Sequence, residues 1–452
     1  MQAGVPLALF EEYMLLDDTP EYPMDPVLLL KFSGILDAAL TREAFERALE
    51  RHPLLSSRAV RKGLRFRWEP SDEPPTITRW DYDANPSIFN SAGYPTLTRV
   101  DLLKGPGLRI YVVESKRENW TRLYFHFHHA VADGMGMLFF VSDALTIYGQ
   151  KIGSISADVK LPEVELTRFS LRNEIGWSFK SYLKNYFNTW KTTWQHIGVY
   201  PRALVTPPPR GRVTLERDRP FIRTLTLSRE ETTAYVRRAK SLGVTLNDLA
   251  LGDYFAALER WLTEVRHDAR RGKLRVMAPI NMRKATTFDR SNMSCCNVVS
   301  TVFLDRDRRS LRRSREEIVR GVADEMNWVK RTDQRYVFLL VLRVLRCAPG
   351  SLRFFLRFPT CRATSVFTNL GKIFDAFPAP RDEFGRIVLG ESVLEDVVSK
   401  SPIRHKTATA VAAHTYAGQL SLCLHYDSRI ISHEDAERFN EIFKDVMFDG
   451  LL

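Results

Sequence analysis

Short apolar runs separated by turn residues predict β-strands along the whole chain. Runs of roughly four to eight residues that are rich in Val, Leu, Ile, Phe and Tyr are typical of buried strands. The predicted strands are 27–32, 65–68, 76–80, 108–113, 123–128, 221–227, 274–280, 297–304, 363–367 and 420–426. The charged turn 114–119 joins two of them, which predicts a hairpin.

Helical periodicity occurs between the strands in both halves of the chain. Apolar side chains three and four residues apart form one face, and a Ser or Thr in front of that pattern marks a helix start. Thr41 is the predicted N-cap of the first helix, while Ser228 and Thr245 each begin a capping sequence. The predicted helices are 41–52, 134–148, 185–197, 229–243, 245–262, 310–329 and 433–446. The chain is therefore predicted to be a mixed α/β protein.

The segment between the two halves has a different composition. Pro207, Pro208 and Pro209 cannot continue a helix or a sheet, so we predict a crossover connection there. The predicted parts are an N-terminal lobe 1–170, a crossover linker 171–220 and a C-terminal lobe 221–452.

Residues 330–362 combine basic and apolar side chains. Eight Lys and Arg residues stand against the single carboxylate of Asp333, with Leu, Val and Phe between them. This composition fits a helix pair that lies on a lipid surface or frames the mouth of an apolar tunnel. It also fits two core helices whose Arg stems are buried while their charged heads are solvated.

Composition constrains the partners of the protein. The chain has 452 residues, of which 44% are hydrophobic, so we expect a large buried core. The 66 Lys and Arg residues exceed the 54 Asp and Glu residues, and the net charge is +12. Residues 1–150 are slightly acidic, so the linker and the second half carry the whole excess. This balance predicts an anionic partner.

Cysteine usage and the N-terminus bear on location. The five cysteines, at 295, 296, 347, 361 and 423, form no C-x-x-C pair, which favours a reducing compartment. The first ten residues lack the basic segment of a signal peptide. No apolar run approaches the about 20 residues that span a membrane. We expect a cytoplasmic protein. Peripheral contact with a membrane is compatible with this expectation.

The segment 124–134, YFHFHHAVADG, is the strongest candidate for chemistry. A predicted strand runs into His128 and His129, then a short loop with Asp133, and Gly134 opens a helix. Imidazole is the usual general base near pH 7. Because neighbouring strand residues point to opposite faces, only one of the two histidines can face a cavity. Asp133 could orient a ring or lock the loop through an Arg.

Other interpretations of this segment stay open. The histidines could be a buried structural pair, or His126, His128 and Asp133 could hold a metal. The chain has no G-x-S-x-G nucleophile motif, no G-x-x-x-x-G-K-[ST] loop and no G-x-G-x-x-G loop. A serine triad and the common nucleotide-binding loops are therefore not expected.

Residues 128–134 match the H-H-x-x-x-D-G motif of the CoA-dependent acyltransferase superfamily, which this chain resembles. That superfamily includes chloramphenicol acetyltransferase, peptide-synthetase condensation domains, polyketide-associated acyltransferases and wax ester synthases. Residues 278–283, APINMR, resemble its P-x-N-x-R segment, and 368–371, TNLG, resemble its SNLG segment. Residues 36–58, with their His-Pro-Leu, resemble the N-terminal strand and helix of the family.

The resemblance implies two chloramphenicol-acetyltransferase-like α/β sandwich lobes in a V-shaped pseudo-dimer, with an active-site tunnel between them. His129 would be the general base, with His128 beside it, and Asp133 would pair with Arg283 across the lobes. Asn369 and backbone N–H groups near Gly134 are the candidates to stabilise an oxyanion. The remaining candidate site residues, which would lie near the cleft, are Asn281 and Gly371.

The resemblance also implies an acyl transfer to a hydroxyl or amine, without a covalent enzyme intermediate. The donor would be an acyl-CoA or a phosphopantetheinyl acyl carrier protein acting as co-substrate, and neither a bound cofactor nor a metal is expected. A monomer is expected because two fused lobes can form the cleft. The alternative is a non-catalytic module that recruits an acyl carrier protein. No nucleic-acid partner is expected, because the positive charge follows no known nucleic-acid-binding motif.

Overall fold

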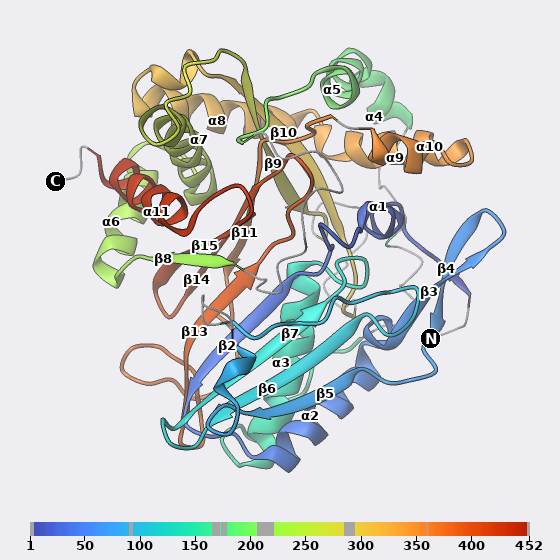
Figure 1. The fold of residues 1–452 in the computed structure, drawn as a ribbon, viewed down its shortest axis with the longest axis vertical. Coiled ribbons are helices and arrows are strands. Elements are labelled where there is room, and N and C mark those ends of the chain that lie inside the picture. Colours follow the sequence, from blue (N-terminus) through green and yellow to red (C-terminus); the bar gives the residue numbers. More distant parts are fainter. Residues whose placement is uncertain are drawn as a thin grey trace.

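The computed structural model describes residues 4–89, 94–164, 172, 179–205, 221–283, 294–358 and 360–449. Two six-stranded sheets, each covered by helices on one face, form two lobes that lie one above the other in Figure 1. This arrangement confirms the predicted two-lobed α/β class. Pro207, Pro208 and Pro209 of the predicted linker lie outside the described residues.

The lower sheet in Figure 1 has the strand order β12-β13-β2-β7-β6-β5. Its strands are β2 (Val27–Ser33), β5 (Thr76–Asp81), β6 (Leu108–Ser115), β7 (Trp120–Phe127), β12 (Val388–Leu389) and β13 (Ser392–Lys400). The helices α2 (Ala38–Arg51) and α3 (Gly134–Lys151) cover one face, and their apolar sides join the core of this lobe. A small sheet beside it consists of β1 (Val5–Pro6), β3 (Ser57–Lys62) and β4 (Arg65–Pro70).

The upper sheet has the order β10-β9-β11-β14-β15-β8. Its strands are β8 (Ile222–Thr226), β9 (Lys273–Asn281), β10 (Val299–Asp307), β11 (Ser365–Lys372), β14 (Thr409–Tyr416) and β15 (Gln419–Tyr426). The helices of this lobe are α6 (Arg229–Ser241), α7 (Leu246–Glu264), α8 (Arg315–Arg331) and α11 (His433–Phe448). A separate hydrophobic core joins α7, α8 and α11 to the sheet.

Strand β13 connects the two lobes. It comes from the second half of the sequence, yet it pairs antiparallel with β2 of the lower sheet, with Lys400 opposite Val27 and Val393 opposite Ser33. Leu394 lies in the core of the lower lobe. The lobe boundaries predicted from the sequence stay a prediction. Strand β13, although it lies beyond residue 221, is part of the lower sheet.

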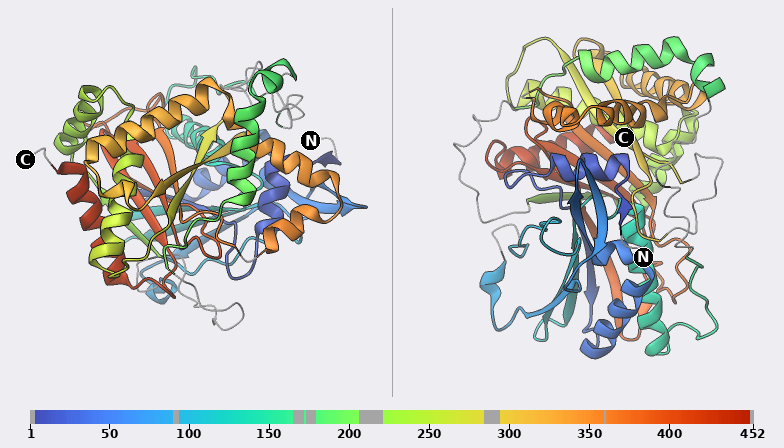
Figure 2. Two further views of the ribbon diagram at one scale, coloured as in Figure 1. Left: turned by 90° about the horizontal axis from the view of Figure 1, so that it is seen from above. Right: turned by 90° about the vertical axis from the view of Figure 1, so that its right-hand side faces the viewer.

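A third group of helices lies at one end of the molecule (Figures 1 and 2). It comprises α1 (Leu9–Asp17), α4 (Phe179–Lys184), α5 (Tyr186–Gly198), α9 (Val337–Cys347) and α10 (Ser351–Arg357). Helix α1 packs against α9 and α10, and α5 packs against α9. Among the described residues, no helix is both long and apolar enough to cross a membrane.

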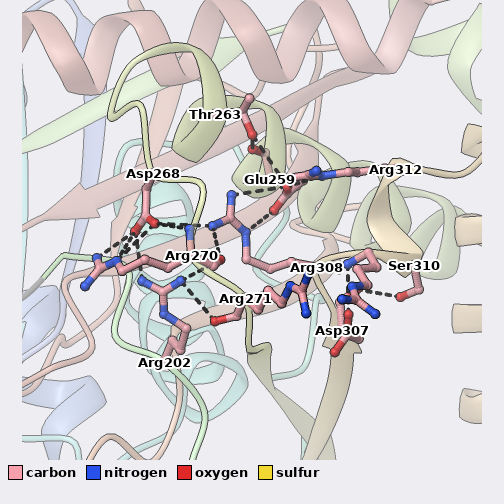
Figure 3. Close-up of polar contacts among 11 residues, drawn as sticks. Arg202, Glu259, Thr263, Asp268, Arg270, Arg271, Asp307, Arg308, Ser310 and Arg312 are labelled. Carbon is pink, nitrogen blue, oxygen red and sulfur yellow. Dashed lines mark hydrogen bonds and ion pairs between the residues drawn. The ribbon is translucent and has the colours of Figure 1, made fainter.

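A network of ion pairs anchors the chain after α5 to the upper lobe (Figure 3). Arg202 donates to Asp268 over 2.8 Å, and Arg270 binds the same carboxylate over 2.7 Å. Next to this pair, Arg308 and Arg312 both bind Glu259 of α7. These four Arg side chains of the linker and the second half are therefore paired with carboxylates.

Every strand predicted from the sequence is present, but several helix starts were wrong or missed. Thr41 is buried inside α2, and the N-cap is Asp37, whose carboxylate accepts from the Leu40 N–H over 2.8 Å. The helix predicted from Ser310 begins at Arg315 instead, because Ser314 provides the capping box. The α-helices and strands that were not predicted are α1, α4, β1, β3, β12, β13 and β14.

Candidate active site

The loop between β7 and α3 carries the two adjacent histidines. Its backbone is held from both sides: the His128 N–H donates to the Gly107 carbonyl over 2.8 Å, and the His129 N–H donates to the Met24 carbonyl over 2.7 Å. Asp133 then caps α3, since its Oδ1 accepts from the Gly136 N–H over 2.8 Å. These bonds determine which way each side chain points.

His128 is fully buried and does not line the cavity described below. Its Nδ1 accepts from the Ala130 N–H over 3.0 Å, so the ring holds the turn of its own loop. Its Nε2 lies 3.8 Å from Asp18 Oδ2. His128 was predicted among the catalytic residues. In the structure its ring is buried and stabilises the turn of its own loop.

His129 lies in the cavity wall and is only partly buried. Its Nδ1 lies 3.0 Å from the Ala132 carbonyl oxygen, which can only accept, so Nδ1 carries the proton and Nε2 has the lone pair. Burial lowers the pKa of the imidazole below its usual value, and this outweighs the hydrogen bonds to carbonyls, which favour the charged form. His129 is thus a neutral imidazole at pH 7, as a general base must be.

Asp133 and Arg283 form a buried two-pronged ion pair between the lobes. Arg283 Nη1 lies 2.9 Å from Oδ2, and Nη2 lies 3.0 Å from Oδ1. Both side chains are buried, and Arg283 also donates to the Cys296 carbonyl over 3.0 Å. The pair expected from the resemblance is therefore present, and it attaches the motif loop to the second half of the chain.

The residues that precede β10 complete this attachment. Asn297 Nδ2 donates to the carbonyls of His129 over 2.6 Å and Ala130 over 2.9 Å, and the Val298 N–H donates to Asp133 Oδ2 over 2.8 Å. We call Asp133, Arg283, Asn297 and Val298 the interlobe clamp. The sequence prediction missed Asn297, because nothing in its spacing indicates that it meets a loop 167 residues away.

His52, of the His-Pro-Leu noted in the sequence, supports the same segment. Its Nδ1 accepts from the Cys295 N–H over 2.9 Å, and its Nε2 donates to Asp143 Oδ2 over 3.1 Å. Asp143 belongs to α3 and also binds Arg51. The clamp segment is therefore held from the lower lobe at two places.

The cavity beside His129 lies between the halves and encloses about 1230 Å³, part of it open to solvent. Tyr13 and Met24 come from the first half, whereas Met277, Asn369 and Lys400 come from the second. The wall is mainly apolar. At its polar part, Arg404 donates to the Tyr13 hydroxyl over 3.0 Å and to Asp17 over 2.7 Å.

Comparison with known proteins gives a match in fold. No protein-family model and no curated protein matches the sequence. The solved first condensation domain of the calcium-dependent antibiotic synthetase superposes with a TM-score of 0.68 and 15% identity, over 99% of this chain and 97% of that chain. The chain has the condensation-domain fold.

Two further structures share this fold. The TRI3 trichothecene 15-O-acetyltransferase from Fusarium sporotrichioides matches with a TM-score of 0.69 and 13% identity, over 98% of this chain and 94% of that chain. Polyketide synthase associated protein 5 from Mycobacterium tuberculosis matches with a TM-score of 0.63 and 14% identity, over 99% and 100%. The resemblance inferred from the motif is confirmed at the level of the fold, and the reaction has to be argued from the site.

The other predicted site residues lie around the same cavity of the condensation-domain fold. Asn281 and Asn369 line it. Asn281 Oδ1 accepts from the Arg283 N–H over 2.9 Å, and Asn369 Oδ1 accepts from the Gly371 N–H over 2.8 Å. Gly371, with φ +72°, therefore allows the turn that positions Asn369.

Gly134 lets the end of β11 approach the motif. A Cβ at this position would lie 2.5 Å from Cδ2 of Leu370. Gly134 and Met135 both line the cavity, at the start of α3, where backbone N–H groups have no partner within the helix. Asn369 Nδ2 donates to Asn247 Oδ1 over 3.3 Å, which leaves its second N–H as a further donor in the cavity wall.

The residues considered for a metal have other partners. His126 Nε2 lies 2.9 Å from Asp25 Oδ2, and Lys400 lies 3.0 Å from Asp25 Oδ1. Burial opposes the charge on Asp25, but Lys400 and His126 hold the pKa of its carboxyl well below the usual value. Within the described part of the chain, no three His, Cys, Asp or Glu side chains come together as a metal site.

Proposed function

We propose that the protein transfers an acyl group from a thioester to a hydroxyl or amine acceptor bound in the cavity. The observation that carries the proposal is His129: a neutral ring in the cavity wall, with Nδ1–H on the Ala132 carbonyl and the lone pair on Nε2. A thioester is already activated, so a positioned base is sufficient chemistry.

In the proposed step, His129 Nε2 takes the proton of the acceptor O–H or N–H as that atom attacks the thioester carbonyl carbon. The new C–O or C–N bond forms, and the carbonyl electrons move to the oxygen. When the tetrahedral intermediate collapses, the C–S bond breaks, and the thiolate takes the proton from His129. The enzyme ends as it began, without a covalent intermediate.

The developing oxyanion needs hydrogen-bond donors. We assign this role to Asn369 Nδ2 and to the backbone N–H groups of Gly134 and Met135, which lie in the same cavity wall. Asp133 does not face the reacting atoms in this scheme, because Arg283, Gly136 and Val298 occupy its carboxylate. It positions the loop that carries His129.

The proposed co-substrate is an acyl-CoA or an acyl carrier protein. The apolar wall, with Met24, Val27 and Met277, suits an acyl chain, and the basic excess of the second half suits a phosphorylated or acidic donor. The alternative is a module that recruits a carrier protein without catalysis. The two proposals predict different results: the acyltransferase forms product and loses this activity without the His129 lone pair, whereas the recruitment module forms no product.

The test is mass spectrometry of products from a panel of acyl-CoAs and acyl carrier proteins with mixed alcohol and amine acceptors. The His129→Asn variant should lose product formation by about 10²- to 10⁴-fold, which is the usual contribution of a general base. His267→Asn is the matched control, because His267 is exposed and lies outside the cavity wall.

Equal rates for His129→Asn and wild type would refute the proposed mechanism. Carrier-protein binding without turnover in the wild type would favour the recruitment module instead.

A further inference from the structure

Helix α5 has its polar face inside and its aromatic face outside. Thr189 and Thr192 are buried, with 4% and 6% of their surfaces exposed, and Thr192 donates to Gln334 over 2.8 Å. In contrast, Phe187 is 84% exposed and Trp190 is 64% exposed. The exposed apolar residues of α5, spaced three and four apart along one stripe, are Phe187, Trp190, Trp194 and Ile197.

The neighbouring helices extend this apolar exposure. Helix α9, which packs against α5, exposes Val344. Helix α10 exposes Phe354, at 71%, and Phe358, which directly follows α10, is exposed too; the two ring centroids lie 6.1 Å apart. Helices α4 and α5, in green, and α9 and α10, in orange, are seen together in the left view of Figure 2. Large side chains seldom gather on a surface in this way unless something covers them.

Basic side chains accompany the exposed rings. The sequences of α4, α5, α9 and α10 contain no Asp or Glu. None of their exposed cations forms an ion pair with a residue that the structure describes; they are Lys180, Lys184, Lys191, Arg343, Arg353 and Arg357. By contrast, four arginines in Figure 3 share the carboxylates of Glu259 and Asp268; they are Arg202, Arg270, Arg308 and Arg312.

We propose that these four helices form a surface that binds an anionic lipid bilayer. We call it the aromatic–basic surface: α4, α5, α9 and α10 with the exposed apolar and basic residues named above. Trp, Tyr and Phe rings prefer the boundary between headgroups and acyl chains, and Lys and Arg are attracted to anionic headgroups. An amphipathic helix with basic flanks lies flat at that boundary.

The pattern favours a bilayer over a protein partner. A protein interface usually surrounds its apolar core with a polar rim. Here the charged groups on the four helices are of one sign only, and they flank apolar stripes. A surface with one sign of charge complements an anionic membrane.

This surface lies close to the candidate active site. Phe338 of α9 packs edge-to-face against Phe10 and Tyr13 of α1, with ring centroids 6.1 and 5.4 Å apart. Phe10 and Tyr13 line the cavity. One layer of side chains therefore separates α9 from the cavity, although bilayer binding itself does not depend on the proposed acyl transfer.

The test is co-sedimentation of the 452-residue protein with vesicles of phosphatidylcholine, alone or mixed with phosphatidylglycerol. We expect binding to the mixed vesicles that weakens as salt increases. Phe187→Ser together with Trp190→Ser should reduce the partition coefficient on the order of tenfold. Lys184→Glu should reduce it at least about fivefold, the effect of one cation near an anionic surface.

Matched controls come from other parts of the surface. Phe384→Ser removes an exposed Phe that also lies between Arg side chains, and Lys240→Glu reverses an exposed Lys on α6. Both variants should bind as wild type does. Equal binding to neutral and mixed vesicles, or equal losses in test and control variants, would overturn the proposal. Absent vesicle binding, with a dimer that Phe187→Ser dissociates, would assign the surface to a second copy instead.

Discussion

The interlobe clamp and the aromatic–basic surface place their polar and apolar groups in opposite ways. In the clamp, the charges of Asp133 and Arg283 are buried and joined by two hydrogen bonds. On the surface, Trp190 and Phe354 are exposed, whereas Thr189 is buried. Each arrangement costs free energy in an isolated folded chain unless something else compensates for it.

The compensation differs between the two regions. For the clamp the compensation lies within the chain, because Asn297 and Val298 also donate hydrogen bonds to buried oxygen atoms of the motif loop. For the surface it would have to come from outside, and we infer a bilayer. The clamp should therefore contribute to folding, whereas the surface should contribute to binding, and variants can separate these two contributions.

The largest effect on stability is expected from Arg283→Ala. It leaves the Asp133 carboxylate buried without its ionic partner, which should lower the free energy of unfolding by about 3–5 kcal/mol. Urea denaturation measures this loss. The control is Arg260→Ala, which breaks the exposed pair of Arg260 with Glu264 and should cost about 0.3–0.5 kcal/mol. Equal losses in both variants would contradict a stabilising clamp.

A smaller loss is expected from Gly136→Ala. A Cβ there would lie 2.8 Å from the carbonyl oxygen and 3.0 Å from the nitrogen of Cys296, both backbone atoms that cannot rotate away. Thermal and urea unfolding should show that the free energy of unfolding falls by about 1–3 kcal/mol. Gly321→Ala, on α8, is the control: its Cβ meets nothing within 4 Å, so stability should stay or increase by up to about 1 kcal/mol.

The smallest effect is expected on the aromatic–basic surface. Trp190→Ala should change the free energy of unfolding by no more than about 0.5 kcal/mol, since the ring is mostly exposed. Trp261→Ala removes a buried ring of α7 and should cost about 3–5 kcal/mol under the same urea titration. A large loss for Trp190→Ala would mean that the ring supports the fold, and the comparison between the two regions would fail.

Local patterns in the sequence predicted local structure well. The hairpin of β6 and β7 and the capping boxes at Ser228 and Thr245 follow from residues that are neighbours in the chain. Helix α1 was missed although Leu9, Phe10, Tyr13 and Met14 have helical spacing. Strand β13 was missed because its partner, β2, lies more than 350 residues away in the sequence.

The sequence by itself determined the order of strand, histidines, aspartate and helix, the α/β class, and the location of the basic excess in the linker and the second half. It also predicted that only one of His128 and His129 faces a cavity, but strand alternation was the wrong reason, because β7 ends at Phe127 and both histidines lie in the loop that follows. The tertiary structure decided which one, because hydrogen bonds from distant carbonyls and amides orient the loop. It alone showed that α5 has its threonines inside and its tryptophans outside, since the direction in which a helix faces depends on what packs against it.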